Sequence, residues 1–157
     1  MRTCLGMKLR TEEIATLDKT STNSVANPIA IALRALFETA MQAQAEADIA
    51  YYPAQSIVGR LRPGVVREGD LWTAESWVNE LVVVEAQGVD LAPELAASMH
   101  ARGTAPQAHS RYRIATIDYV AREQRQLLGR IGGPRRLGML RDALVAHVRL
   151  HGFGRSV

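Results

Sequence analysis

Asn-Glu-Leu-Val-Val-Val-Glu-Ala-Gln-Gly, residues 79–88, is the stretch of sequence that decides the fold. Val82, Val83 and Val84 form the longest β-branched run in the chain, and such side chains suit a buried, pleated strand. The run is too short to favour a helix, and Gly88 ends it. These residues therefore predict a central strand followed by a tight turn, with the flanking segments packed on its sheet.

The flanking segments predict helices and strands in a mixed order. Asn27-Pro28 is a typical helix start, and apolar residues follow it at helical spacing to about residue 45. Asp90 is expected to cap a second helix that ends before Gly103. The other expected elements are strands over 14–17, 48–52 and 112–119, helices over 71–77 and 137–151, and loops over 53–70 and 129–136. This order predicts an α+β fold, a single layered mixed α/β domain.

Composition narrows the class of protein. The chain has 157 residues, 47% hydrophobic residues and a net charge of +3 that is spread along its length, so no dense basic face for nucleic acid is expected. Cys4 is the single cysteine, which excludes an internal disulfide and a thiolate zinc site. No apolar stretch reaches the roughly 18 residues that a membrane helix needs, and no secretory signal is visible. We therefore expect a cytoplasmic protein without nucleic-acid or membrane partners.

Five further segments form a series of motifs, and they read Val-Ala-Asn-Pro-Ile-Ala-Ile-Ala (25–32), Ala-Asp-Ile-Ala (47–50), Gly-Val-Val-Arg-Glu-Gly-Asp-Leu (64–71), Ser-Trp-Val-Asn-Glu-Leu-Val-Val-Val-Glu-Ala-Gln-Gly (76–88) and Tyr-Arg-Ile-Ala-Thr-Ile-Asp-Tyr-Val-Ala (112–121). In this order they resemble motifs of the C-terminal domain of the 5'-nucleotidase family, which includes UDP-sugar hydrolases and cyclic phosphodiesterases. The resemblance spans about residues 12 to 152. It implies an N-terminal extension over residues 1–11 and a 5'-nucleotidase C-terminal-like domain over residues 12–157.

The departures from the family bear on function. The family's metallophosphatase domain, which holds two metals and performs hydrolysis, has no counterpart in these residues. The phosphate-binding arginine of the family aligns with Val58, its base-stacking loop with residues 122–125, and its helix-start Asp with Ile31. The resemblance therefore implies a retained scaffold without the nucleotide chemistry, and we expect neither a metal nor a cofactor.

Candidate ligand contacts follow from the alignment with the family's binding site. Trp77 stands at a family Phe and can stack on a planar ligand, although a core position is the favoured alternative for it, as for Trp72 and Tyr52. Arg60 is a candidate replacement for the phosphate arginine. The expected contacts are Tyr52, Gln55, Ser56, Arg60, Trp77, Asn79 and Arg122.

Candidate catalytic residues are Asp118 and Tyr119 at a strand end, and His109 in a polar connector. A carboxylate and a phenol can perform acid/base chemistry, and His109 can act as a base on a loop. The alternatives are that Asp118 caps a turn, Tyr119 packs and His109 is an exposed loop residue. For Glu75 and Glu85 we favour solvated charges over a place in a cleft.

His147 and His151 lie four residues apart and so share a helix face, but without a third ligand no metal site is expected.

Three functions from different classes fit these observations. The chain is a domain that binds a small molecule in a remodelled pocket, without hydrolytic activity. Alternatively, it is an enzyme repurposed for cyclisation or isomerisation in a specialised biosynthetic pathway, or the substrate-binding half of a split metallophosphatase. A homodimer is also expected, because a domain without its partner exposes the old inter-domain face.

Overall fold

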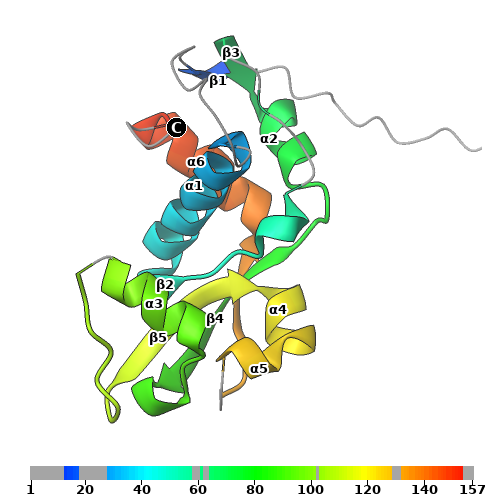
Figure 1. Cartoon of the computed structure of the whole chain (residues 1–157). Coiled ribbons are helices and arrows are strands. Elements are labelled where there is room, and N and C mark those ends of the chain that lie inside the picture. Colours follow the sequence, from blue (N-terminus) through cyan, green and yellow to red (C-terminus); the bar gives the residue numbers. More distant parts are fainter. Residues whose placement is uncertain are drawn as a thin grey trace, which may run out of the picture.

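The structure is a computed structural model that describes residues 13–17, 28–57, 61, 64–101, 103–128 and 132–153. Its strands form two sheets (Figure 1). The small sheet pairs β1 (Glu13–Leu17) with β3 (Gly64–Arg67) in antiparallel fashion. The main sheet has the order β2 (Ile49–Ala50), β5 (Arg111–Ile117), β4 (Glu80–Gln87), β6 (Arg135–Met139). The central strand predicted from residues 79–88 and the α+β class are both confirmed.

The helices of the described residues are α1 (Pro28–Ala45), α2 (Glu68–Ala74), α3 (Pro93–Ala101), α4 (Asp118–Glu123), α5 (Arg125–Leu128) and α6 (Leu140–His151), together with the 3-10 turns η1 (Ala54–Ser56) and η2 (Gly88–Asp90). Helices α1, α3, α4 and α6 contact strands of the main sheet, whereas α2 lies against α6 and β3. Helices α1 and α6 lie side by side, and both contact β4 (Figure 1). The buried side chains of α1 recur at helical spacing, as the sequence pattern predicts: Leu33, Leu36, Phe37, Ala40 and Met41.

Strand β4 is covered differently at its two ends. Its residues 81–84 are all buried, whereas Glu85 and Gln87 are exposed and Ala86 between them is buried. Successive side chains of a strand point to opposite faces, so four buried residues in a row mean that both faces are covered. The start of β4 therefore lies in the core, and one face of its end meets solvent.

Three predictions of local structure are wrong. The loop expected over 53–70 contains η1, β3 and the start of α2. The loop predicted to run to residue 136 and the helix predicted from Leu137 are replaced at their junction by β6. Its residues Arg135, Arg136 and Gly138 are exposed, and Leu137 and Met139 are only half-buried, so this short edge strand has no fully buried face to mark it in the sequence. Asp90 does not cap α3: it ends η2, and α3 begins at Pro93.

Some predictions fall outside the described residues. The N-terminal extension, Cys4, the capping residue Asn27, and Val58 with Arg60 all lie there. No helix in the described part of the chain is long and apolar enough to cross a membrane. Within the same part, no group of three or more His, Cys, Asp or Glu side chains is placed to hold a metal ion.

Candidate functional site

The strand order brings three segments together at one edge of the main sheet. β2 runs parallel to β5, with Ile49 opposite Ile114, and β4 runs antiparallel to β5, with Leu81 opposite Ile117. The residues that follow β2, those that follow β5 and those that precede β4 must therefore meet. These are η1, the start of α4 and the loop over residues 75–79.

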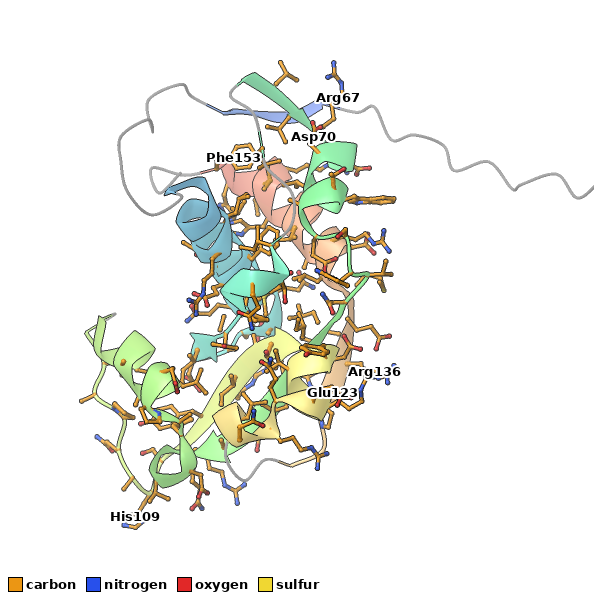
Figure 2. All side chains as sticks on the ribbon, turned by 45° about the vertical axis from the view of Figure 1, so that its right-hand side comes forward. Arg67, Asp70, His109, Glu123, Arg136 and Phe153 are labelled. Atoms are coloured by element: carbon orange, nitrogen blue, oxygen red, sulfur yellow. The ribbon has the colours of Figure 1, made fainter. Side chains whose placement is uncertain are left out.

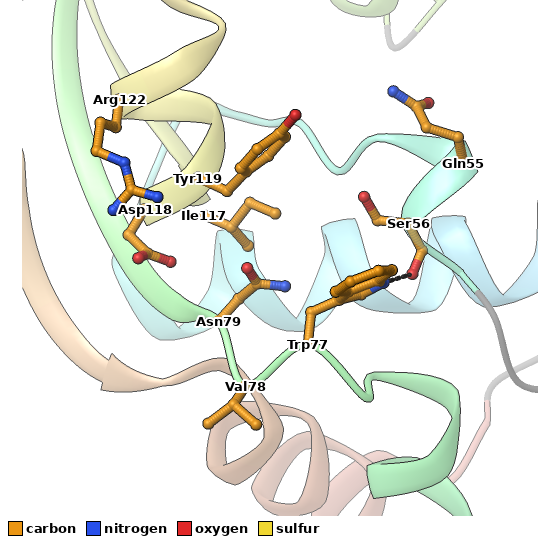
Figure 3. A pocket seen from close by; sticks show the side chains of 9 residues that line it. All are labelled: Gln55, Ser56, Trp77, Val78, Asn79, Ile117, Asp118, Tyr119 and Arg122. Carbon is orange, nitrogen blue, oxygen red and sulfur yellow. Dashed lines mark hydrogen bonds between the residues drawn. The ribbon is translucent and has the colours of Figure 1, made fainter.

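A cleft of about 440 Å³ opens where these segments meet (Figure 3). Its lining residues are Gln55, Ser56, Trp77, Val78, Asn79, Ile117, Asp118, Tyr119 and Arg122. A volume of this size lies within the range typical of small-molecule sites. The cleft combines aromatic surface with an amide, a carboxylate and a guanidinium group.

Trp77 stands at the rim of the cleft with 62% of its surface exposed, so the core position favoured from the sequence is wrong. Its indole Nε1 donates a hydrogen bond of 3.0 Å to the backbone oxygen of Ser56, which joins the loop before β4 to η1 (Figure 3). The next residue, Val78, has a φ of 58°, a left-handed conformation that is unfavourable for a β-branched residue. Such strain concentrates at functional loops, and here it accompanies the exposed indole.

Asp118 and Arg122 supply charge on the α4 side of the cleft. The Oδ1 atom of Asp118 accepts a hydrogen bond of 3.0 Å from the backbone N–H of Glu80, which ties the start of α4 to the start of β4. The Nε of Arg122 donates to Glu123 Oε1 at 2.7 Å, and this hydrogen bond raises the pKa of the guanidinium. Arg122 therefore keeps its positive charge at physiological pH, beside the Asp118 carboxylate (Figure 3).

Asn79 and Glu75 form a buried polar pair behind the cleft. The Nδ2 of Asn79 donates to Glu75 Oε1, and the Glu75 side chain is fully buried. Burial raises the pKa of Glu75, the hydrogen bonds with Asn79 and the charge of Arg141 lower it, and the charge of Asp118 raises it. The expectation of a solvated Glu75 is therefore wrong, because a lone Glu in a turn gives no sign of its burial in the sequence.

Most, but not all, of the predicted site residues meet at this cleft. Gln55, Ser56, Trp77 and Asn79 line it together with Asp118, Tyr119 and Arg122. Tyr52 does not: it is fully buried against Phe37, with ring centroids 4.9 Å apart. Arg60 lies outside the described residues. Val78 and Ile117 line the cleft without having been predicted, and their positions next to Trp77 and Asp118 were the available signal.

His109 lies elsewhere. It is exposed in the turn between α3 and β5, and it does not line the cleft. Figure 2 shows it at one end of the molecule, well separated from Glu123, the neighbour of Arg122. The described geometry therefore does not bring His109 to Asp118 and Tyr119, and we leave it out of the candidate site.

The described residues form a mixed α/β domain with a cleft at the strand ends, and comparison with known proteins names the family. The family described as 5'-nucleotidase, C-terminal domain, matches residues 13–131. The chain belongs to this family, as its motifs predict. No curated protein sequence matches it.

Solved structures agree on the fold. A 5'-nucleotidase precursor from Thermus thermophilus superposes with a TM-score of 0.65 at 15% identity, over 92% of this chain and 38% of that one. A putative 5'-nucleotidase from Staphylococcus aureus, solved with alpha-ketoglutarate, gives 0.62 at 13% identity, over 94% and 40%. The chain thus spans about two fifths of the length of each relative, and at these identities the likeness concerns the fold alone.

Proposed function

We propose that this domain binds a small planar molecule in the cleft between η1, the loop before β4 and α4, and that these residues alone hydrolyse no nucleotide. The observation that carries the proposal is the exposure of two aromatic side chains at one cleft, Trp77 at 62% and Tyr119 at 42%. Exposed aromatic surface is costly in water and is typical of sites that stack a ligand.

Polar groups around the aromatic side chains support a small and partly polar ligand. Asn79 and Asp118 offer hydrogen-bonding groups, and Arg122 offers a positive charge. A small-molecule site usually places a few polar groups beside aromatic and apolar surface, and this cleft has both kinds of lining. Because the family's phosphate arginine and stacking loop have no counterparts in the sequence, we propose that the pocket is remodelled for a ligand other than a nucleotide.

A thermal-shift screen tests this proposal. The purified protein is screened against nucleotides, nucleosides and planar metabolites, and a ligand at a hundred times its dissociation constant should add about 2.7 kcal/mol of stability. The Trp77→Ala variant should lose most of that gain, while Val89→Ala, which removes another exposed apolar side chain outside the cleft, should keep it. An equal gain in both variants would place the ligand elsewhere.

A repurposed enzyme is the second candidate function, and it is supported by the presence of Asp118 and Tyr119 in the same cleft. A carboxylate and a phenol at one site can exchange protons with a bound substrate, as cyclisation or isomerisation requires. Any ligand found in the screen should then be converted by the wild type and not by Asp118→Asn. That variant keeps the oxygen that accepts from Glu80 and removes the charge.

The same thermal-shift screen tests the third candidate function, the substrate-binding half of a split metallophosphatase. Stabilisation by a nucleotide would favour it, with the hydrolase on another chain. Self-association is proposed because Trp77, Val78 and Tyr119 leave apolar surface at the cleft rim. Light scattering should then give the mass of a homodimer, and the dimer should weaken in Trp77→Ala.

A further inference from the structure

Glu75 is a buried acid that the proposed function does not use. Its side chain is fully buried, and its Oε2 atom has no hydrogen-bond partner among the described residues. The Tyr52 hydroxyl is also buried without such a partner in that part of the chain, and burial together with the charge of Glu75 raises its pKa. A buried polar atom without a hydrogen-bond partner costs free energy, so the burial of this carboxyl group calls for an explanation.

The hydrogen bond to Glu75 fixes which end of the Asn79 amide faces the cleft. A carboxylate only accepts hydrogen bonds, so the NH₂ group of Asn79 must turn toward it. The Asn79 oxygen then points toward Ile117 and Tyr119, across the floor of the cleft (Figure 3). An amide held in this way turns its oxygen to the ligand as an acceptor, because one N–H of its NH₂ group is already donated to Glu75.

We propose that Glu75 is a positioning residue that locks the Asn79 amide, so that the cleft selects planar ligands carrying an N–H or O–H donor at that point. This inference rests on the proposed function, because it assumes that the cleft binds a ligand. Glu75 does not touch the ligand itself: it acts through Asn79.

Glu75 can accept the hydrogen bond from Asn79 whether its carboxyl group is ionised or protonated. Burial and Asp118 raise its pKa, whereas Asn79 and Arg141 lower it. When ionised, the carboxylate has no donor to offer to the Asn79 oxygen. When protonated, it can carry the proton on Oε2, the atom without a partner among the described residues, while Oε1 continues to accept from Asn79.

The lock is tested first without any ligand. Exchange of the Asn79 side-chain NH₂ protons is measured by NMR and compared with that of Gln87, an exposed amide on β4. One buried hydrogen bond should slow exchange at Asn79 about tenfold or more. Glu75→Gln, whose amide can accept or donate, should keep part of this protection, and Glu75→Leu should remove it. Equal rates at Asn79 and Gln87 in the wild type would overturn the lock even if no variant folds.

Selectivity is tested with indole and benzofuran, two probes of the same shape that differ in one ring atom. Indole donates a hydrogen bond and benzofuran cannot, so the wild type should bind indole about tenfold more tightly. Glu75→Gln, whose amide can donate as well as accept, should lower this ratio. The exposed control Glu85→Gln should keep it, and Glu75→Leu should bring it close to one. An unchanged ratio in Glu75→Leu would refute the proposal.

The two experiments separate the two claims. If neither probe moves the resonances of the cleft residues, the proposed function fails for such ligands, and the exchange rates still decide whether Glu75 holds Asn79. If both probes bind without preference while Asn79 is protected, the cleft binds small molecules but Glu75 does not set its selectivity, and the inference is wrong.

Discussion

Two glutamates near opposite ends of β4 lie in different surroundings. Beside its start, Glu75 is fully buried and hydrogen-bonded to Asn79. Near its end, the exposed side chains of Glu85 and Arg111 approach only to 4.0 Å, and the hollow they line is open to water. The comparison teaches that the surroundings of a glutamate matter more than the residue type. Burial away from water raises the pKa of Glu75 and holds it against one partner, Asn79.

The largest effect is expected from a core substitution at the start of β4. Leu81 is fully buried, so Leu81→Ala should lower the free energy of unfolding by about 2–5 kcal/mol through lost burial and a cavity. Urea unfolding followed by circular dichroism measures the loss. A cost below about 1 kcal/mol would mean that this end of the strand is not the tightly packed one.

A smaller loss is expected at Gly88, just after β4. A Cβ atom there would lie 2.1 Å from the backbone oxygen of Gln107, so Gly88→Ala forces the backbone to shift. Such overpacking costs about 1–3 kcal/mol, or several degrees in melting temperature. Calorimetry measures it, and Gly133→Ala, where no atom lies within 4 Å of the added Cβ, is the matched control.

The pH dependence of stability sharpens the comparison of the two glutamates. Burial raises the pKa of Glu75 above its ordinary value of 4.5, so the folded state holds that proton more tightly than the unfolded chain does. The stability this adds is fully present below the unfolded pKa and is lost as pH rises through the folded pKa. Glu75→Gln should therefore gain stability relative to wild type as pH rises, in unfolding curves measured over that range.

The smallest effect is expected at the exposed end. Glu85→Gln removes a carboxylate whose near cation, Arg111, is 4.0 Å away and whose side chain is 60% exposed, so stability should change by less than about 0.5 kcal/mol. A loss as large as that expected of Leu81→Ala would erase the distinction between the two ends.

The sequence predicts the parts of the fold that have one periodic buried face. The valine run gives β4, and the apolar residues of α1 recur at helical spacing. Strand β6 is not predicted because it begins with the exposed Arg135 and Arg136, and a short edge strand of this kind resembles a basic loop in the sequence. Periodicity reports burial along regular elements, and it carries little information where an element lacks a continuous buried face.

The site is predictable mainly through the family resemblance, which marks the segments that meet at the cleft. The side-chain environment within those segments is not predictable in the same way. Trp77 was expected in the core and is exposed. It lies in a loop next to the left-handed Val78, and a loop has no periodic pattern from which exposure could be predicted. Glu75 was expected in water and is buried, because its burial depends on packing that residues distant in sequence provide.

The most direct test of ligand binding in the cleft uses the two tryptophans of the chain. The best stabilising ligand is titrated into ¹⁵N-labelled protein, and the two indole N–H resonances are followed by NMR. We predict that the Trp77 resonance shifts in a saturable way, while Trp72, which packs under Arg141 at 4.7 Å and does not line the cleft, stays in place. A stabilising ligand that leaves Trp77 unmoved would contradict the account.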